Sequence, residues 1–368
     1  MRTGLICRQV AGLPLRSPGG SIASSRVKSD ITMPVVRIWV YEGILASSVA
    51  GVVDVFTAAN WIAASHRAPG KISPLQWRIE SLDGKAVRTA SGQLIDVDGA
   101  ISTRSPADAL IVPGPFVPDV ERFLQRKEVV TPLLAALRRQ HRRGVLLASY
   151  CTGSFLLAEA GLLDGSVATT HWAKGKTFER RYPGIELRIN DIITEQDGII
   201  CSGAVTSALN LALRIVQKLV GAEIAAETGK LMLIDSNRVA QSSYASRQEE
   251  PHSDPLVARA QRWMEKSLQR GFSLGELARQ LAVSERTLNR RFKRATGKAP
   301  LHYLQTLRID VAKRLLENRE LTMDAVSQRV GYGDLSTFRR LFRRETGLSP
   351  GEYQRRFSRR RRGAALAA

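Results

Sequence analysis

The chain contains RRFKRATGKAP at residues 290–300 and RLFRRETGLSP at residues 340–350. The two stretches share Phe, Arg, Thr, Gly and Pro at matching positions, with a constant offset of 50 residues. Such a repeat indicates two copies of one supersecondary unit. In each copy a basic, amphipathic run is followed by a Gly suited to a left-handed helix stop and by a Pro that prevents continuation. The repeat therefore predicts two equivalent helices that end at Gly297 and Gly347.

The residues before each of these helices predict a helix-turn-helix. In the first copy, Ser273 is a candidate N-cap with Glu276 three positions later, as in a capping box, and Ser284 caps the second helix after a turn at Ala282-Val283. In the second copy, Thr322 is the first cap and Gly331-Tyr332-Gly333 forms the turn. A connecting helix is predicted between the copies, with one apolar face formed by Leu304, Leu307, Val311 and Leu315.

The positive charge of the chain is concentrated in the same region. The formal net charge is +21, and residues 253–368 hold 26 Lys or Arg against 11 Asp or Glu, whereas residues 35–252 carry only +2. A basic module favours a polyanion, because each neutralised phosphate releases counterions. A solvated basic face on a small helical bundle is the alternative. Two helices on a fixed connector also suit successive major-groove segments of a duplex, about 34 Å apart.

The segment from about Leu256 to Phe357 resembles the AraC/XylS DNA-binding domain, and GYGDLSTFRRLFRRETGLSPGEYQRRF, residues 331–357, is similar to the signature of that family. The resemblance implies that the second helix of each unit reads bases of double-stranded DNA. It implicates Arg286, Asn289 and Arg290 in the first unit and Leu335, Ser336, Arg339 and Arg340 in the second. Lys293 and Arg343 are expected to contact phosphates.

The larger first part of the chain alternates short apolar runs with helical patterns, which predicts an α/β domain with a mainly parallel sheet. A small hairpin is expected around Glu195–Gly198. The candidate strands are Val35–Tyr41, Trp77–Ser81, Ala109–Val112 and Val145–Ser149, and the candidate helices are Val52–Ala64, Val129–Arg139 and Ser154–Glu159.

The stretch LLASYCTGSFLL, residues 146–157, predicts a tight strand-to-helix turn with Cys151 at its centre. Small residues at 149 and 153 suit a nucleophile elbow, where neighbouring side chains have little room. We expect the following helix N-terminus to lower the pKa of the Cys151 thiol. His171 is the candidate base.

This region resembles the PfpI-like branch of the class I glutamine amidotransferase superfamily. SYCTGSFLLAEAGLLDGSVATTHW, residues 149–172, is especially similar to the sensor domain of GlxA-type AraC-family regulators. The resemblance implies a flavodoxin-like domain and a homodimer. Two positions depart from the enzymes of that superfamily: Ser48 stands where they have an acidic residue, and Thr152 stands where a His often follows the Cys. Asp54 is near Ser48 but on another helical face.

These departures favour an active site that has lost its catalytic function over a working enzyme. The preferred hypothesis is a pocket for a small-molecule effector, formed by Ser48, Cys151, Thr152 and His171. Thiol-based redox sensing and dimerisation alone remain alternatives, as does a cysteine hydrolase or amidase that carries a DNA-binding appendage.

The predicted organisation has five segments and no cofactor. Residues 1–34 are an N-terminal extension, with Met33 as an alternative start. The α/β domain covers 35–222. Residues 223–252 hold a helix (Glu223–Leu233) and most of a polar linker (Gln241–Pro255, with an exposed His252). The DNA-binding domain covers 253–357, and 358–368 is a basic tail containing Arg359–Arg362. Three dispersed cysteines and five histidines show no metal-ligand spacing. No apolar run reaches the ~18 residues of a membrane span. A cytoplasmic regulator is expected, and RNA polymerase is a candidate partner.

Overall fold

The structure is a computed structural model, and it describes residues 33–66, 74–105, 107–235, 240–244, 252–318 and 321–358. Most of the N-terminal extension, the segment 245–251 of the linker and the Arg359–Arg362 run lie outside these residues.

A seven-stranded sheet forms the centre of the first part, with strand order β10-β11-β7-β6-β1-β2-β5. All neighbouring strands are parallel except β10 and β11, which form the predicted antiparallel hairpin. The mainly parallel α/β prediction is confirmed. The strands of this sheet are β1 (Val35–Trp39), β2 (Gln76–Ser81), β5 (Gly99–Ala100), β6 (Ala109–Val112), β7 (Leu146–Tyr150), β10 (Ile193–Gln196) and β11 (Ile199–Ser202). Two small ladders join β3 (Val87–Arg88) to β4 (Leu94–Ile95) and β8 (Val167–Ala168) to β9 (Glu186–Leu187).

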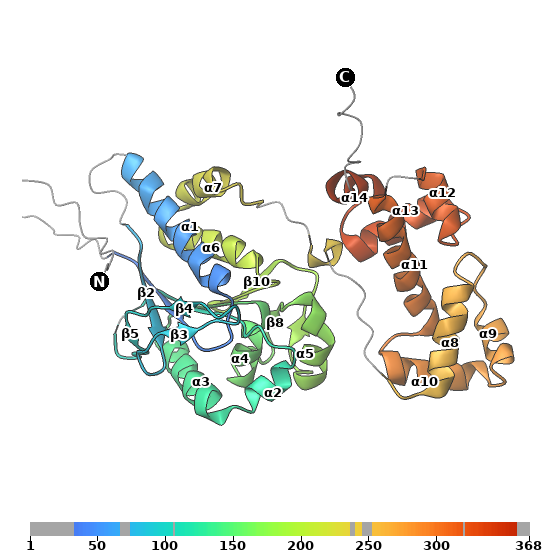
Figure 1. Ribbon diagram of the computed structural model, residues 1–368, viewed down its shortest axis with the longest axis horizontal. Helices are drawn as coiled ribbons and strands as arrows, with labels where there is room; N and C mark the ends of the chain where they lie inside the picture. Colours follow the sequence, from blue (N-terminus) through green and yellow to red (C-terminus); the bar gives the residue numbers. More distant parts are fainter. Residues whose placement is uncertain are drawn as a thin grey trace, which may run out of the picture. The chain divides into compact units, whose positions relative to one another are not determined.

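Helices cover both faces of the sheet (Figure 1). One face carries α1 (Ala46–Ser65), α6 (Ser207–Leu219) and α7 (Ala222–Leu231). The other carries α2 (Val120–Leu124), α3 (Lys127–Arg142) and α4 (Ser154–Glu159). The short turn η1 (Cys151–Gly153) leads into α4, and the short turn η2 (Trp172–Lys174) leads into α5 (Gly175–Arg181). The candidate helices are confirmed, although α1 begins six residues earlier than the periodicity indicated, since its N-cap residue is Leu45, which makes no side-chain capping hydrogen bond.

Among the described residues, α1 is the helix long and apolar enough to cross a membrane by length and composition. Its apolar side is instead used in the core, where Val52, Val55, Phe56 and Ala59 are fully buried. This helix packs against α6 and α7. Its hydrophobicity is therefore explained by a central place in the α/β domain.

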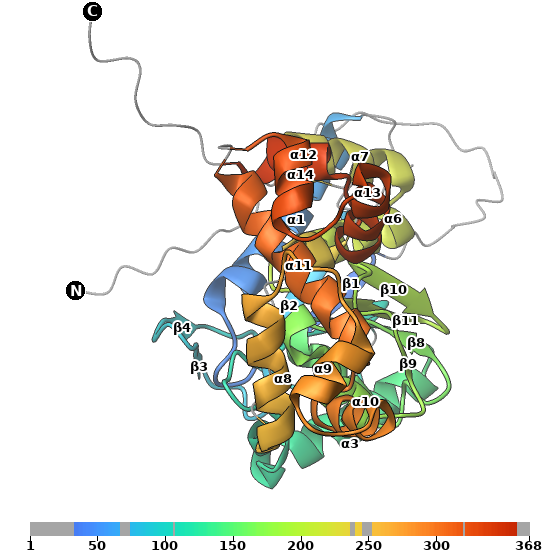
Figure 2. The same ribbon diagram turned by 90° about the vertical axis from the view of Figure 1, so that its right-hand side faces the viewer.

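From Pro255 onward, the elements in the described residues are all helices, and their buried side chains form two separate cores. The first comprises residues of α8 (Pro255–Lys266), α9 (Leu274–Gln280) and α10 (Glu285–Thr296), and the second those of α12 (Met323–Arg329), α13 (Leu335–Thr346) and α14 (Pro350–Phe357). The connecting helix α11 (Pro300–Glu317) joins them (Figure 2). The single apolar face predicted for α11 was incomplete: Leu304 and Leu307 enter the first core, whereas Ile309, Ala312 and Leu316 enter the second.

Two pieces of the polar linker lie among the described residues, 241–244 and 252–255. Its first residues form the turn η3 (Gln241–Ser243), and Gln241 is buried. His252 is half-buried and its Nε2 lies 2.9 Å from Gln261 Oε1, so the expectation of an exposed His252 was wrong. The polarity of the linker does not reveal that the His252 imidazole will form a hydrogen bond with a side chain of the helix that follows.

Candidate DNA interface and cysteine elbow

The first helix-turn-helix unit is set by its caps. The Ser273 hydroxyl accepts a hydrogen bond from the Glu276 backbone N–H, and Ser284 accepts one from that of Thr287. Ala282 turns the chain with φ 54°, and Gly297 ends α10 in the left-handed conformation. Each cap satisfies a backbone group that the helix itself leaves unpaired. The boundaries of α9 and α10 are therefore those that the sequence predicted.

One side of α10 is exposed and polar. Leu288 and Phe292 are fully buried, so they fix the rotation of the helix about its axis. Four residues that the resemblance implicated in DNA contacts are all exposed on the opposite side: Arg286, Asn289, Arg290 and Lys293. Arg and Asn side chains can pair bidentately with guanine and adenine edges in the major groove.

The second unit repeats this arrangement at α13. Phe338 and Phe342 are fully buried, and Ser336, Arg339, Arg340 and Arg343 are exposed. Leu335 differs, because it is half-buried and packs against the second core. Asp334 caps α13 by accepting hydrogen bonds from the backbone N–H groups of Ser336 and Thr337. Asp is a favoured N-cap residue, so this cap could have been predicted from the sequence, although none was predicted there.

The two units are joined by a buried arginine on α11. The guanidinium of Arg308 donates to the carbonyl oxygens of Leu268 (3.0 Å) and Arg270 (2.6 Å), which belong to the first unit. It also lies over the Tyr332 ring of the second unit, 5.2 Å from the centroid. Gly331 packs directly against this contact. Arg308 therefore fixes the spacing of α10 and α13, a role that no local pattern in the sequence marked.

The cysteine elbow, residues Ser149–Gly153, has the predicted tight geometry. Cys151 takes a left-handed backbone conformation with φ 58°, which is rare outside glycine. A Cβ added at Gly153 would lie 2.5 Å from the Val112 carbonyl oxygen, and one at Gly114 would lie 2.5 Å from the Thr152 nitrogen. The turn is therefore held between β7 and the chain that follows β6.

The hydroxyl groups around the elbow are already paired within the domain. Ser48 accepts a hydrogen bond from the Tyr150 hydroxyl at 3.0 Å and donates to the Leu45 carbonyl oxygen. Thr152 donates to the Pro115 carbonyl oxygen at 2.7 Å. Asp54 is exposed, as its predicted helical face requires. Ser48 thus reaches the elbow from α1 without supplying a carboxylate.

Cys151 and His171 are linked through Thr170, not directly. The Thr170 hydroxyl donates to the Cys151 carbonyl oxygen at 3.1 Å, while the His171 Nδ1 accepts from the Ala173 backbone N–H. No hydrogen bond joins Cys151 Sγ to His171 within the part of the chain that the structure describes. Burial, with Lys174 adding to it, lowers the pKa of His171. The imidazole is therefore biased towards its neutral form.

The expected lowering of the Cys151 pKa was wrong. Burial raises the pKa of Cys151 to about 11, and the hydrogen bonds from Thr152 offset it only in part. The reason is that α4 is short and the thiol is 4% exposed, so desolvation of the thiolate outweighs the helix N-terminus. A raised thiol pKa argues against the readily oxidised thiolate on which the redox-sensing alternative depends.

Alkylation of native Cys151 should consequently be slow. With a pKa of about 11, only about one thiol in a thousand is ionised at pH 8. We expect iodoacetamide to react about 100 times more slowly with Cys151 in the native protein than after unfolding, and the rate to rise with pH without levelling off between about pH 6 and 9. Mass spectrometry of the peptide that contains Cys151 measures this rate. A plateau in the rate below pH 8 would mean that the thiol is activated after all.

The linker residue Gln241 is inserted into the α/β domain beside this site. Its side-chain nitrogen lies within hydrogen-bond distance of the Thr169 hydroxyl and of the carbonyl oxygens of Thr170, Ile189 and Asp191, at 2.9–3.2 Å. Its side-chain oxygen accepts from the Ala204 backbone N–H at 3.0 Å. Thr170 is also the residue that bonds to Cys151. The sequence gives no sign of this role for Gln241, because its partners are distant in the chain.

Comparison with known families supports both halves of this description. Residues 71–218 match the DJ-1/PfpI family, and residues 277–356 match a helix-turn-helix domain family. The HTH-type transcriptional regulator CdhR of Pseudomonas aeruginosa is 30% identical over 281 residues, which is 75% of this chain and 81% of that protein. The HTH-type transcriptional regulator GlxA of Rhizobium meliloti is 26% identical over 60% of this chain and 68% of its own length.

A crystal structure of an AraC family transcriptional regulator from Pseudomonas putida aligns with 54% of this chain and 99% of its own, at 22% identity and a TM-score of 0.45.

Proposed function

Because this chain belongs to the family of HTH-type transcriptional regulators that join a DJ-1/PfpI domain to an AraC-type helix-turn-helix domain, we propose that α10 and α13 read adjacent major-groove segments of one operator. The exposed polar sides of these two helices carry the proposal. In it, Arg286, Asn289 and Arg290 contact bases from α10, and Ser336, Arg339 and Arg340 do so from α13. Lys293 and Arg343 contact phosphates. Leu335 contributes an apolar contact at most, since part of its surface is in the core.

We propose that the α/β domain binds an effector and has no catalytic activity. A nucleophile needs a base and an orienting group within reach. Cys151 is held protonated by burial, Ser48 replaces the acid, and His171 Nδ1 is occupied by a backbone N–H. Of the four proposed pocket residues, Ser48 and Thr152 use their hydroxyls internally, so Cys151 and His171 are the groups that remain to meet a ligand.

The remaining features of the proposal concern assembly and organisation. We propose a cytoplasmic homodimer that responds to a small-molecule effector and acts on transcription by RNA polymerase. The α/β domain would cover residues 35–222 and the DNA-binding domain residues 253–357. The curated relatives CdhR and GlxA bear the names of transcriptional regulators, which agrees with a protein that acts on DNA.

Removal of Arg290 and Arg340 should abolish specific binding to the operator. Each arginine that pairs with a base contributes about 1–3 kcal/mol, so the double variant Arg290→Ala/Arg340→Ala should lose specific affinity by about a hundredfold or more. Fluorescence anisotropy with the DNA upstream of the gene, in the presence of competitor DNA and across a salt series, measures the loss.

The matched control is Arg279→Ala/Arg329→Ala. These two arginines are exposed at equivalent positions in the last turns of α9 and α12, and their removal changes the net charge by the same amount. The control should weaken binding equally for all sequences and leave the discrimination intact. Equal losses in the two double variants would refute base reading by α10 and α13.

Cys151→Ala should retain operator binding, whereas a cysteine hydrolase would lose its turnover.

A further inference from the structure

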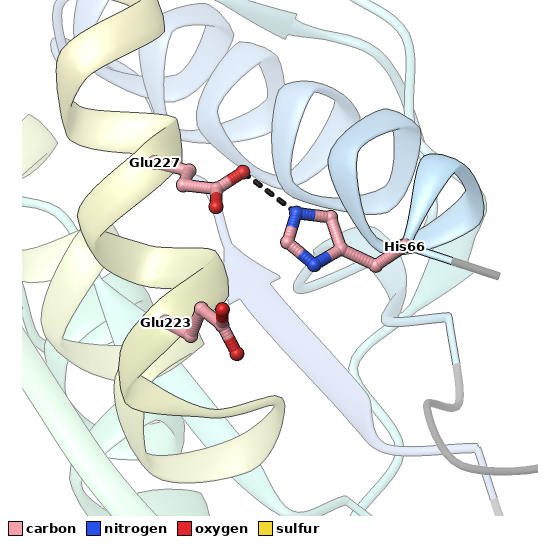
Figure 3. Close-up of side chains that lie close together, drawn as sticks. All are labelled: His66, Glu223 and Glu227. Carbon is pink, nitrogen blue, oxygen red and sulfur yellow. Dashed lines mark hydrogen bonds and ion pairs between the residues drawn. The ribbon is translucent and has the colours of Figure 1, made fainter. Parts of the chain in front are cut away.

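The end of α1 and the first turns of α7 bring together three side chains with metal-binding atoms. His66 directly follows α1, and Glu223 and Glu227 lie one turn apart on α7 (Figure 3). His66 Nε2 lies 2.7 Å from Glu227 Oε2, and one ligand atom from each of the three residues lies within 4.8 Å of the others. The separation of 161 positions between His66 and Glu227 explains why no metal-ligand spacing was visible in the sequence.

The position of each ligand is set by the backbone. The His66 N–H donates to the Ile62 carbonyl oxygen, which continues the turn of α1, and α1 packs along α7. Residues four apart on a helix lie on the same side, so both glutamates face the imidazole. Figure 3 shows the carboxylates of α7 and the ring of His66 turned towards the same space.

The dimensions and exposure of this group suit a small divalent ion. A tetrahedral ion with bonds of about 2.0–2.1 Å holds its ligand atoms about 3.4 Å apart. To reach that value, the distance between His66 Nε2 and Glu227 Oε2 must increase, and the longest distance between any two of the ligand atoms must decrease. The side chains of His66 and Glu227 are 29% and 41% exposed and Glu223 is exposed, so all three can rotate and water can complete the coordination.

We propose that His66, Glu223 and Glu227 form a surface binding site for Zn²⁺. The alternative explanation is a simple ion pair between His66 and Glu227, which would involve only these two residues and leave Glu223 without a role. An imidazole nitrogen with two carboxylate oxygens is a ligand set that favours Zn²⁺ over Mg²⁺ or Ca²⁺, which prefer oxygen ligands alone. The bound ion would cross-link α1 to α7, the last helix before the linker that contains Gln241.

The test is a zinc titration of the full-length protein freed of metal by a chelator. Competition with a chromophoric chelator should show one Zn²⁺ bound per chain, with binding weakened by at least about tenfold in each of His66→Gln, Glu223→Gln and Glu227→Gln. His141→Gln and Glu179→Gln are matched controls, since they alter a half-buried helical histidine and an exposed helical glutamate elsewhere in the same domain. The controls should bind zinc as the unchanged protein does.

Cobalt substitution identifies the ligands independently. Co²⁺ in the proposed site should give visible d–d absorption without the near-ultraviolet charge-transfer band of a cobalt–thiolate bond. A thiolate band would assign the ion to a cysteine site and overturn the proposal. Zinc binding that is absent, or that all three variants retain, would overturn it as well. Operator binding by the three variants without zinc should match that of the unchanged protein, so a failure here is separable from a failure of the proposed DNA contacts.

Discussion

Gly331→Ala should destabilise the DNA-binding domain by about 3 kcal/mol and reduce operator affinity strongly. Gly331 has φ +84°, a conformation that costs a side-chain-bearing residue about 1–2 kcal/mol. A Cβ there would also overlap the Leu268 carbonyl oxygen and the Arg308 guanidinium. Because these atoms belong to the contact between the two helix-turn-helix units, the added methyl group must push the units apart.

Gly333→Ala provides the matched control. It adds the same methyl group two residues later, where no atom lies within 4 Å of the added Cβ. Thermal unfolding and operator titration of both variants measure the effect, and we expect Gly333→Ala to change either quantity by much less. If the two variants bind the operator equally well, the spacing of α10 and α13 does not depend on the Arg308 contact.

Gln241→Ala should destabilise the α/β domain by about 2–4 kcal/mol. The amide is 3% exposed, and its removal leaves the Ala204 N–H and several carbonyl oxygens without their partner. Gln241→Glu should destabilise the α/β domain more than Gln241→Ala does at neutral pH, because a carboxylate would face the carbonyl oxygens of Thr170, Ile189 and Asp191. Burial and these oxygens favour the protonated acid, so the stability of this variant should recover as the pH falls.

Urea unfolding of the Gln241 variants as a function of pH measures these effects. Gln217→Ala is the control, since Gln217 is an exposed amide whose oxygen accepts a hydrogen bond from Arg214 at the surface. Its stability should change by less than about 0.5 kcal/mol. If Gln241→Ala unfolds like this control, the buried amide is not holding the linker to the domain.

The sequence predicted best those features that depend on neighbours in the chain. Ser284, Thr322, Gly297 and Gly347 determine helix ends through local backbone hydrogen bonds, so the helix-turn-helix units could be placed from them alone. Two-residue strands such as β3 and β9 were not found, because they are too short to show a period.

Features that depend on tertiary packing were missed or misjudged. The pKa of Cys151 follows from its burial, which the elbow pattern does not report. Arg308 and Gln241 read as ordinary polar residues until their distant carbonyl partners are known. His66 was missed for the same reason, because Glu223 and Glu227, its neighbours on α7, are distant from it in the sequence.

The insertion of Gln241 also sets the length of chain that tethers the DNA-binding domain. With the tether fixed at Gln241, at most about 45 Å of extended chain is available before Asp254, the N-cap of α8. If Gln241 is released, the last fixed point of the α/β domain moves back to about Asp235, and the maximum length of the tether increases by about 20 Å. In a dimer, this reach limits the separation of the two operator half-sites. Affinity for an operator whose half-sites are moved apart by two helical turns would therefore depend on whether Gln241 is in place.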